Sequence, residues 1–434
     1  MKKVLIITYY WPPSGGAGVQ RWLKFAKYLR EFGWEPIIYT PENPEAPVRD
    51  SSLEKDIPDN LTVIKRKIWE PYTAYKKFIG QKKEQKINAG FLSENKKPKL
   101  SEIFSVWIRG NFFIPDARKF WIKPSIKFLT NYLKNYPVDA IISTGPPHSM
   151  HMIALGLKQS LGIPWLADFR DPWTNIDFYN DLKLTGSADK KHHKLEKKVF
   201  KNADSVVLIS KGMADDFNKI YQRNYEVITN GYDSDDISNV SKIEPDKKFS
   251  ISYIGTMVKT RNPISFWKAI KQLTDTNKEF ANDLEIKLIG KLDYSVQQSL
   301  EEFMLQKYIT KINYLPHNKV IKLQKQSQVL LLLINNTPNA KMILTGKLFE
   351  YMAAHRPILC IGPFDGDAAK IIRDTNSGVI CGFSSSEKIK TNILKFYNSF
   401  KKGQLKSKSI NIEKFSRKNL TSDLVKILNK FDIN

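Results

Sequence analysis

The chain has 434 residues, a length at which one hydrophobic core stops growing, so two domains are expected. Hydrophobic residues make up 41% and aromatic residues 12%, which excludes a largely disordered chain. The net charge of +25 indicates an anionic partner such as nucleic acid or a membrane surface, or else a genome biased towards lysine.

Two features bear on localisation. No apolar run reaches the roughly 18 residues that a membrane span needs. Cys360 and Cys381 lie in apolar, strand-like runs, which is typical of reduced core residues in a cytoplasmic protein. We therefore predict a cytoplasmic protein, with attachment to the inner face of the cell membrane as an open addition.

The N-terminal segment begins with a buried strand predicted over 3–8. Its apolar run is too short for a signal peptide and lacks a small-residue cleavage site. The loop Pro12-Pro13-Ser14-Gly15-Gly16-Ala17-Gly18 then leads into a helix predicted to end near Phe32. Glycines before a helix let backbone amides approach an anion, so Gly15 and Gly16 are candidate phosphate-binding residues. A tight turn alone would also need glycine.

Predicted strands and helices alternate to the end of the chain, which indicates α/β units with parallel sheets. The strands are expected at 3–8, 35–40, 61–66, 138–143, 164–169, 204–210 and 225–229, and then at 250–255, 284–289, 311–315, 328–334, 357–361 and 378–381. Helices of the second half are expected at 263–275, 294–306, 317–326, 346–354, 366–374 and 386–400. We predict an N-terminal domain over 1–232, a polar linker over 233–248, a C-terminal domain over 249–405 and an amphipathic segment over 406–434 that packs back on the N-terminal domain.

Residues 67–117 interrupt this alternation and are predicted to be an insertion with short helices. Residues 51–135 contain 18 lysines and arginines against 8 acidic residues, with tryptophan, tyrosine and phenylalanine among them. Basic residues beside aromatic ones favour the surface of a bilayer. No nucleic-acid-binding motif accompanies the charge, so we expect no nucleic-acid partner.

Charged residues follow a strand in Leu166-Ala-Asp-Phe-Arg-Asp-Pro-Trp173. Doubly wound folds bind ligands at the carboxyl ends of their strands, which makes Asp168, Arg170 and Asp171 candidates. A structural ion pair among them is the alternative. His148 lies in another strand-to-helix turn, Thr144-Gly-Pro-Pro-His148, and is either structural or able to reach a reacting group.

The second half contains a possible anion site. Gly255 and Thr256 end a strand, and Arg261 precedes a helix beginning near Asn262-Pro263. A cation beside a helix N-terminus is suited to a diphosphate, although a solvated basic loop has the same pattern. Asp233-Ser-Asp235 is formally an Asp-x-Asp metal motif, but it lies in the linker, so no metal site is predicted.

The most informative stretch is Thr345-Gly-Lys-Leu-Phe-Glu-Tyr-Met-Ala-Ala-His-Arg-Pro357, a short helix that ends where a buried strand begins. The apolar residues of the helix form one face, which leaves Glu350 able to point towards a cleft. There a carboxylate can accept hydrogen bonds from both hydroxyls of a ribose. An ordinary exposed glutamate is the alternative. The segment resembles the nucleotide-sugar motif of the retaining glycosyltransferases of family 4, in which this glutamate binds the donor ribose.

The resemblance implies a GT-B fold, two Rossmann-like doubly wound α/β domains that face each other across a cleft. It also implies site residues. The residues implied in donor binding are Gly15, Gly16, Gly255, Thr256, Arg261, Lys347, Leu348 and Glu350. Those implied in catalysis are Asp171, His148 and Arg261, and those on the acceptor side are Asp168 and Arg170. The chain departs from the family at Thr256, where an arginine is usual, and at Met342, where many members have a second glutamate.

The function implied is transfer of a sugar, with retention and without a metal or other cofactor, from a nucleoside diphosphate, UDP or GDP. The acceptor would be a glycan or a lipid-linked sugar in cell-surface polysaccharide synthesis. Two alternatives remain open. One is a sugar-nucleotide epimerase of the same fold, and the other is a non-catalytic protein that binds a membrane surface or a glycan.

Overall fold

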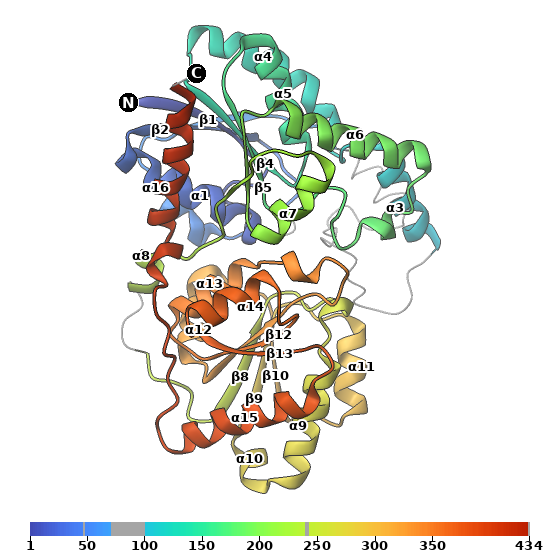
Figure 1. Ribbon diagram of the computed structural model, residues 1–434, viewed down its shortest axis with the longest axis vertical. Coiled ribbons are helices and arrows are strands. Elements are labelled where there is room, and N and C mark those ends of the chain that lie inside the picture. Colours follow the sequence, from blue (N-terminus) through green and yellow to red (C-terminus); the bar gives the residue numbers. More distant parts are fainter. Residues whose placement is uncertain (47, 71–99, 239–242, 433–434) are drawn as a thin grey trace. The chain divides into compact units, whose positions relative to one another are not determined.

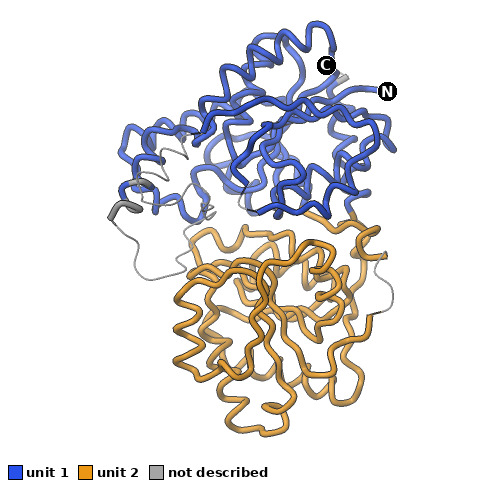
Figure 2. The backbone as a smooth tube through the Cα atoms, turned by 180° about the vertical axis from the view of Figure 1, so that it is seen from behind, with its two compact units in different colours: residues 1–89, 98–229, 417–434 blue, residues 90–97, 230–416 orange. Residues whose placement is uncertain are grey.

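Strands and helices alternate in the computed structural model, which describes residues 1–46, 48–70, 100–238 and 243–432 (Figure 1). The described residues form two compact units (Figure 2). Unit 1 contains residues from 1–70, 100–229 and 417–432, and unit 2 contains those of 230–416. The last helix of the chain therefore belongs to the same unit as the first strand.

Unit 1 is built on a seven-stranded parallel sheet with the order β3-β2-β1-β4-β5-β6-β7. All residues of β4, β5 and β6 are buried, which explains their continuous apolar character. The strands are β1 Lys2–Ile7, β2 Trp34–Pro41, β3 Thr62–Arg66, β4 Ala140–Gly145, β5 Trp165–Phe169, β6 Ser205–Leu208 and β7 Glu226–Val227.

Helices of unit 1 include one from the far end of the sequence, α16, which packs against α1. Leu420, Leu424 and Leu428 of α16 lie in the same apolar cluster as Trp22 and Leu29 of α1. The helices are α1 Ala17–Leu29, α3 Leu100–Phe112, α4 Lys119–Asn135, α5 Ser149–Leu161, α6 Gly186–Asn202, α7 Lys211–Ile220 and α16 Arg417–Leu428. A 3₁₀ helix, η2 Ser51–Asp56, precedes β3.

Unit 2 repeats the plan with six parallel strands in the order β10-β9-β8-β11-β12-β13. The strands are β8 Phe249–Ile254, β9 Leu284–Ile289, β10 Ile309–Ile312, β11 Val329–Leu333, β12 Ile358–Ile361 and β13 Gly378–Cys381. The helices are α8 Ser234–Ser238, α9 Ile264–Thr276, α10 Lys278–Asp283, α11 Tyr294–Glu302, α12 His317–Gln326, α13 Gly346–Ala353, α14 Asp367–Asp374 and α15 Ser386–Lys401.

Each sheet reverses its strand order once, between β1 and β4 in unit 1 and between β8 and β11 in unit 2. This is the arrangement of doubly wound folds, which bind ligands at the carboxyl ends of the strands beside the reversal. The predicted fold class of two Rossmann-like α/β domains is confirmed. A ligand-binding site is therefore expected at the loops that follow β1, β4, β8 and β11.

The predicted strands all form, with shifts at their ends. Helix α10 was not predicted, because its six residues directly follow α9 and its start is marked only by Asn277, whose side chain accepts a hydrogen bond from the Phe280 amide at 2.9 Å. Helix α8 lies at the start of the predicted linker. Residues 71–99 of the predicted insertion and 239–242 of the linker are outside the described residues. Among the residues described, no helix is long and apolar enough to cross a bilayer.

A buried ion pair joins α1 to the sheet of unit 1. The Asp168 carboxylate, on β5, accepts hydrogen bonds from Arg21 at 2.9 and 3.1 Å, from Trp22 Nε1 at 2.8 Å and from Thr144 Oγ1 at 2.8 Å. Arg21 also donates to the carbonyl oxygens of Ile228 and Thr229. Both charged side chains are almost completely excluded from solvent. Asp168 thus forms the structural ion pair and does not reach an acceptor surface.

A second buried carboxylate has a different environment. Glu196 of α6 is fully buried and accepts hydrogen bonds from the amide and hydroxyl of Thr174, in the loop after β5. The described residues provide no ion-pair partner for it. Burial therefore raises the pKa of Glu196 to about 7, although the hydrogen bonds from Thr174 favour the charged form.

We predict that Asp168→Asn lowers the free energy of unfolding by about 3–5 kcal/mol, because Arg21 would be left buried without its counter-charge. Urea unfolding of the variant and the wild type measures the difference. A loss below about 1 kcal/mol would show that the pair does not hold unit 1 together.

We also predict a pH-dependent stability due to Glu196. Since its folded pKa lies above the value of about 4.5 for an unfolded chain, the folded state binds the proton more tightly. The free energy of unfolding should fall by about 3 kcal/mol as the pH rises from 4.5 to 8. Glu196→Gln should remove this pH-dependent fall in the free energy of unfolding. The control Glu302→Gln, at an exposed site of unit 2, should show the same fall as the wild type. An unchanged pH slope in Glu196→Gln would contradict the assignment.

Candidate active site

The loops after β8 and β11 meet at the strand-order reversal of unit 2. The side chain of Arg261, after β8, donates from Nε to Asn335 Oδ1 after β11 and from Nη1 to the Thr256 carbonyl at 3.2 Å. The Asn336 amide donates to the Thr260 carbonyl at 2.8 Å. These bonds hold the Arg261 guanidinium at the edge of the sheet where doubly wound folds bind phosphates. The side chain of Thr256 forms no bond in this network.

Gly255 directly follows β8 and has a φ of +124°, a conformation that residues with a side chain rarely adopt. A Cβ atom there would lie 2.5 Å from Lys347 Nζ and 2.6 Å from Lys347 Cε. Glycine is therefore needed both for the backbone and for the close approach of the lysine from α13. Gly255, Arg261 and Lys347 thus lie in one cluster.

Tyr253 of β8 completes the cluster. Its hydroxyl lies 3.4 Å from Lys347 Nζ, which also lies 4.9 Å from the centre of the ring. Burial lowers the pKa of Lys347, and the charge of Arg261 adds to this effect. Burial raises the pKa of Tyr253, but Lys347 and Arg261 outweigh it, so the pKa of Tyr253 is lowered overall. Among the described residues neither cation has a carboxylate at ion-pair distance, so the cluster has the charge to bind an anion.

Glu350 lies one turn after Lys347 on α13, and its side chain is 18% exposed. Gln324 Nε2 of α12 donates to its Oε2 at 2.9 Å, and His317 Nε2 lies 3.3 Å from its Oε1. Glu350 is therefore a half-buried carboxylate with an organised environment, which a simple exposed helix residue would not have. Leu348 is fully buried in the apolar core of unit 2 and contributes packing instead of a ligand contact. The usual second glutamate is absent: Met342, in its place, is buried.

Four residues around this site were not predicted from the sequence: His317, Gln324, Asn335 and Tyr253. His317 begins α12 directly after the predicted 311–315 strand, so the rule about strand ends that selected Asp168 could have selected it. Gln324 and Tyr253 carried no such signal, because they lie inside a predicted helix and strand.

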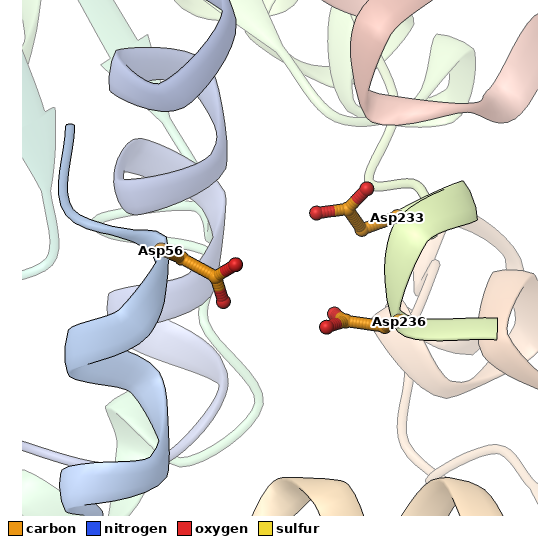
Figure 3. Close-up of side chains that lie close together, drawn as sticks. All are labelled: Asp56, Asp233 and Asp236. Carbon is orange, nitrogen blue, oxygen red and sulfur yellow. The ribbon is translucent and has the colours of Figure 1, made fainter. Parts of the chain in front are cut away.

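The acidic residues of the linker also take part in unit 2. Asp236 lies on α8 and Asp233 directly precedes this helix, whereas Asp56 lies at the end of η2 in unit 1 (Figure 3). Asp236 Oδ2 lies 3.9 Å from His317 Nδ1. Lys325 Nζ donates to the Ile237 carbonyl at 2.6 Å, which ties α8 to α12. Within unit 1, Asp56 pairs with Lys24 at 2.8 Å.

The glycine loop of unit 1 has a more limited capacity for anions than predicted. The Gly15 amide donates to the Val48 carbonyl at 2.9 Å and is buried, so it is not available to a phosphate. Gly16 is exposed, has φ +94° and directly precedes α1. Of the two predicted glycines, Gly16 alone is placed to let a ligand approach the helix N-terminus.

Arg170 connects the two loops at the strand-order reversal of unit 1. Its guanidinium donates to the carbonyl of Gly18, after β1, at 3.0 Å and to that of Pro146, after β4. Burial lowers the pKa of Arg170, with Asp171 acting in the opposite direction. Arg170 thus holds these two segments in place, while its neighbour Asp171 is exposed to solvent.

His148 begins the turn into α5 and is buried. Its ring stacks on Trp173 with centroids 4.5 Å apart and an interplanar angle of 1°. Trp173 Nε1 donates to His192 Nδ1 at 3.0 Å, so the stack is fixed in turn. Burial, helped by His151, His192 and Arg170, holds the pKa of His148 well below its usual value. A neutral imidazole in this position can donate or accept a hydrogen bond but is a poor source of positive charge.

Two family models match the chain. The model of Glycosyltransferase Family 4 matches residues 90–236, and that of Glycosyl transferases group 1 matches residues 233–408. The second match contains the whole Gly255, Arg261, Lys347 and Glu350 cluster. Comparison with curated protein sequences gives no match.

Solved structures of low sequence identity share the fold over nearly the whole chain. The sucrose-phosphate synthase tll1590 from Thermosynechococcus elongatus is 12% identical with a TM-score of 0.61 and full coverage of both chains. WaaG, a glycosyltransferase involved in lipopolysaccharide biosynthesis, is 14% identical with a TM-score of 0.57 and 99% coverage of both. A Staphylococcus aureus TarM mutant in complex with fondaparinux, α-GlcNAc-glycerol and UDP is 11% identical with a TM-score of 0.57, covering 99% of this chain and 100% of that one. From the family models and this fold, the chain belongs to the GT-B glycosyltransferases of family 4 and group 1.

Proposed function

We propose that this protein transfers a sugar, with retention, from a nucleoside diphosphate to a glycan or lipid-linked acceptor in cell-surface polysaccharide synthesis. The observation that carries the proposal is the pair of cations Arg261 and Lys347, which have no carboxylate partner among the described residues and lie beside a glycine at the reversal of the unit 2 sheet. A TarM structure contains UDP and a glycan, which supports UDP as the first nucleotide to test and GDP as the second.

In this proposal the donor diphosphate lies against Gly255, Arg261 and Lys347, with α9 adding the favourable partial charge of a helix N-terminus. As the bond from the sugar to the diphosphate breaks, negative charge grows on the leaving oxygens. Two hydrogen bonds hold Arg261 in place, and Tyr253 contacts Lys347. The two side chains would therefore stabilise that charge without having to change their positions. Two fixed cations can supply the charge that a divalent metal supplies in other enzymes, so we propose a metal-independent reaction.

Unit 1 would bind the acceptor through the surface near Asp171 and the Gly16 end of α1. The neutral His148 would offer a hydrogen bond to the reacting sugar. Retention would follow if the acceptor attacks the face from which the diphosphate departs, with a leaving-group oxygen assisting removal of its proton. No separate protein nucleophile is then required.

A thermal-shift screen with UDP, GDP, ADP and their common sugars tests the donor, because a ligand of the folded state raises its stability. Product analysis then separates the two enzyme classes. A transferase forms a new glycoside only when acceptor is present, whereas a sugar-nucleotide epimerase forms an epimer without any acceptor. Absence of stabilisation by every nucleotide would favour the non-catalytic alternative.

Glu350→Ala should weaken binding of the nucleoside diphosphate by roughly 2–4 kcal/mol, because hydrogen bonds from both ribose hydroxyls to a carboxylate are lost. Isothermal titration of the variant, with exposed Glu301→Ala of the same unit as control, measures this loss. Equal affinity in Glu350→Ala and the wild type would remove Glu350 from the donor site.

A contact with an anionic membrane is supported by a pair of exposed aromatic residues on unit 1, Trp69 and Phe120. Their side chains are 63% and 43% exposed, and their rings contact edge to face with centroids 4.9 Å apart. Lys119 Nζ lies 5.0 Å from the Phe120 ring centre. Exposed aromatic rings with a cation beside them are suited to the interface of a bilayer with acidic lipids.

Trp69→Ser and Phe120→Ser should each reduce sedimentation with phosphatidylglycerol vesicles roughly tenfold, because burial of an aromatic ring in the interface is lost. Tyr136→Ser, an equally exposed site beyond the C-terminal end of α4, is the matched control and should bind as the wild type does. Binding should also weaken as salt is added. Equal binding to neutral vesicles, or no effect of either substitution, would contradict the membrane contact.

A further inference from the structure

A chain of side chains from three helices of unit 2 ends on the Glu350 carboxylate. Asp236 of α8 faces His317 Nδ1 at 3.9 Å, and His317 Nε2 of α12 faces Glu350 Oε1 of α13 at 3.3 Å. Gln324, seven residues after His317 and also on α12, donates to the other oxygen of Glu350 at 2.9 Å. Both carboxylate oxygens are therefore engaged from the same helix.

The direction of the His317 contact follows from elementary chemistry. An ionised carboxylate can only accept hydrogen bonds, so His317 Nε2 must carry the hydrogen that points to Glu350. The negative charge of Asp236 near the opposite nitrogen makes the imidazole a better donor, in the way a carboxylate behind a histidine does in other sites. The hydrogen bond from Lys325 to the Ile237 carbonyl holds α8 against α12.

Gln324 provides an independent indication that this arrangement serves a ligand. The side chain is completely buried, and its Oε1 has no hydrogen-bond partner in the described part of the chain. A buried amide oxygen without a partner costs stability, and an apolar residue of the same size would avoid the cost. The amide is useful through its other atom, Nε2, which orients Glu350.

We propose that His317 is a positioning residue for donor binding: with Gln324 it holds the Glu350 carboxylate in the orientation that accepts the two ribose hydroxyls. This inference rests on the proposed function. A carboxylate can accept about four hydrogen bonds, so contacts with His317 and Gln324 are compatible with two more from a ribose diol. Without the imidazole, Glu350 can rotate, and binding must restore its orientation at a cost in entropy.

The test is isothermal titration with UDP, GDP and their 2′,3′-dideoxy counterparts, which lack the hydroxyls in question. His317→Ala should weaken binding of the hydroxylated nucleotide about tenfold, the value of one hydrogen bond to a charged group. The affinity for the dideoxy nucleotide should change less than about twofold, because that ligand does not use Glu350. His317→Gln, which retains an N–H donor, should recover most of the loss.

Two further variants separate positioning from folding. His317→Phe keeps the ring volume and removes the donor, so it should show the same loss as His317→Ala even where the alanine variant folds poorly. Lys322→Ala, an exposed site on α12, is the matched control and should bind as the wild type does. In a Glu350→Ala background, His317→Phe should have no further effect.

The outcomes distinguish this inference from the proposed function. If the wild type binds none of these nucleotides, the proposed donor site fails and the inference fails with it. If the wild type binds and Glu350→Ala weakens binding, but His317→Phe binds normally or loses both ligands equally, the donor site stands and the positioning role is overturned.

Discussion

The reversal of strand order in each parallel sheet is the constraint on which the rest depends. Two adjacent parallel strands whose connections leave in opposite directions open a gap between their carboxyl ends. In unit 2 the gap lies between β8 and β11, and Arg261 and Asn335 meet there. In unit 1 it lies between β1 and β4, where Arg170 connects the Gly18 and Pro146 carbonyls. In each unit an arginine therefore bonds to both sides of the gap, from the loop after β5 in unit 1 and from the loop after β8 in unit 2.

The two units use positive charge differently. In unit 1, Arg21 is matched by Asp168 and is fully buried, and the two Nη atoms of Arg170 donate to backbone carbonyls that they hold in place. In unit 2, Arg261 and Lys347 are held by neutral groups, an amide, a carbonyl and a phenol. Neutral partners fix the position of a cation without cancelling its charge. Unit 2 is therefore the unit that can bind a diphosphate strongly.

The sequence predicted the fold well, because buried parallel strands are continuous apolar runs and glycine, proline and polar residues mark their ends. It also selected Gly255, Arg261, Lys347 and Glu350, three of which follow strand ends or begin a helix. It assigned a ligand role to Asp168 as well as to Asp171, since two acids three residues apart at one strand end look alike until burial is known. Leu348 lies beside Lys347 in sequence, but the helix turns it into the core.

What the sequence could not supply is the set of partners from distant positions. Gln324 and His317 contact Glu350 from an adjacent helix, and Tyr253 contacts Lys347 from a strand, so only the fold reveals that they act together. For the glycine loop, in contrast, the sequence predicted more binding groups than the fold leaves available. Its composition predicted two amides open to a ligand, whereas the tertiary contact between Gly15 and Val48 uses one of them.

The position of α16 has a consequence for how the protein is made. Its leucines complete the apolar core around α1, yet they follow the whole of unit 2 in the sequence. During translation the first unit must wait, with part of its core uncovered, until all of unit 2 has emerged from the ribosome. Unit 2 has its complete sequence at an earlier stage and can fold first, which reverses the usual order for a chain of two domains. Loss of even the last two turns of α16 would then damage the unit that contains β1 and α1.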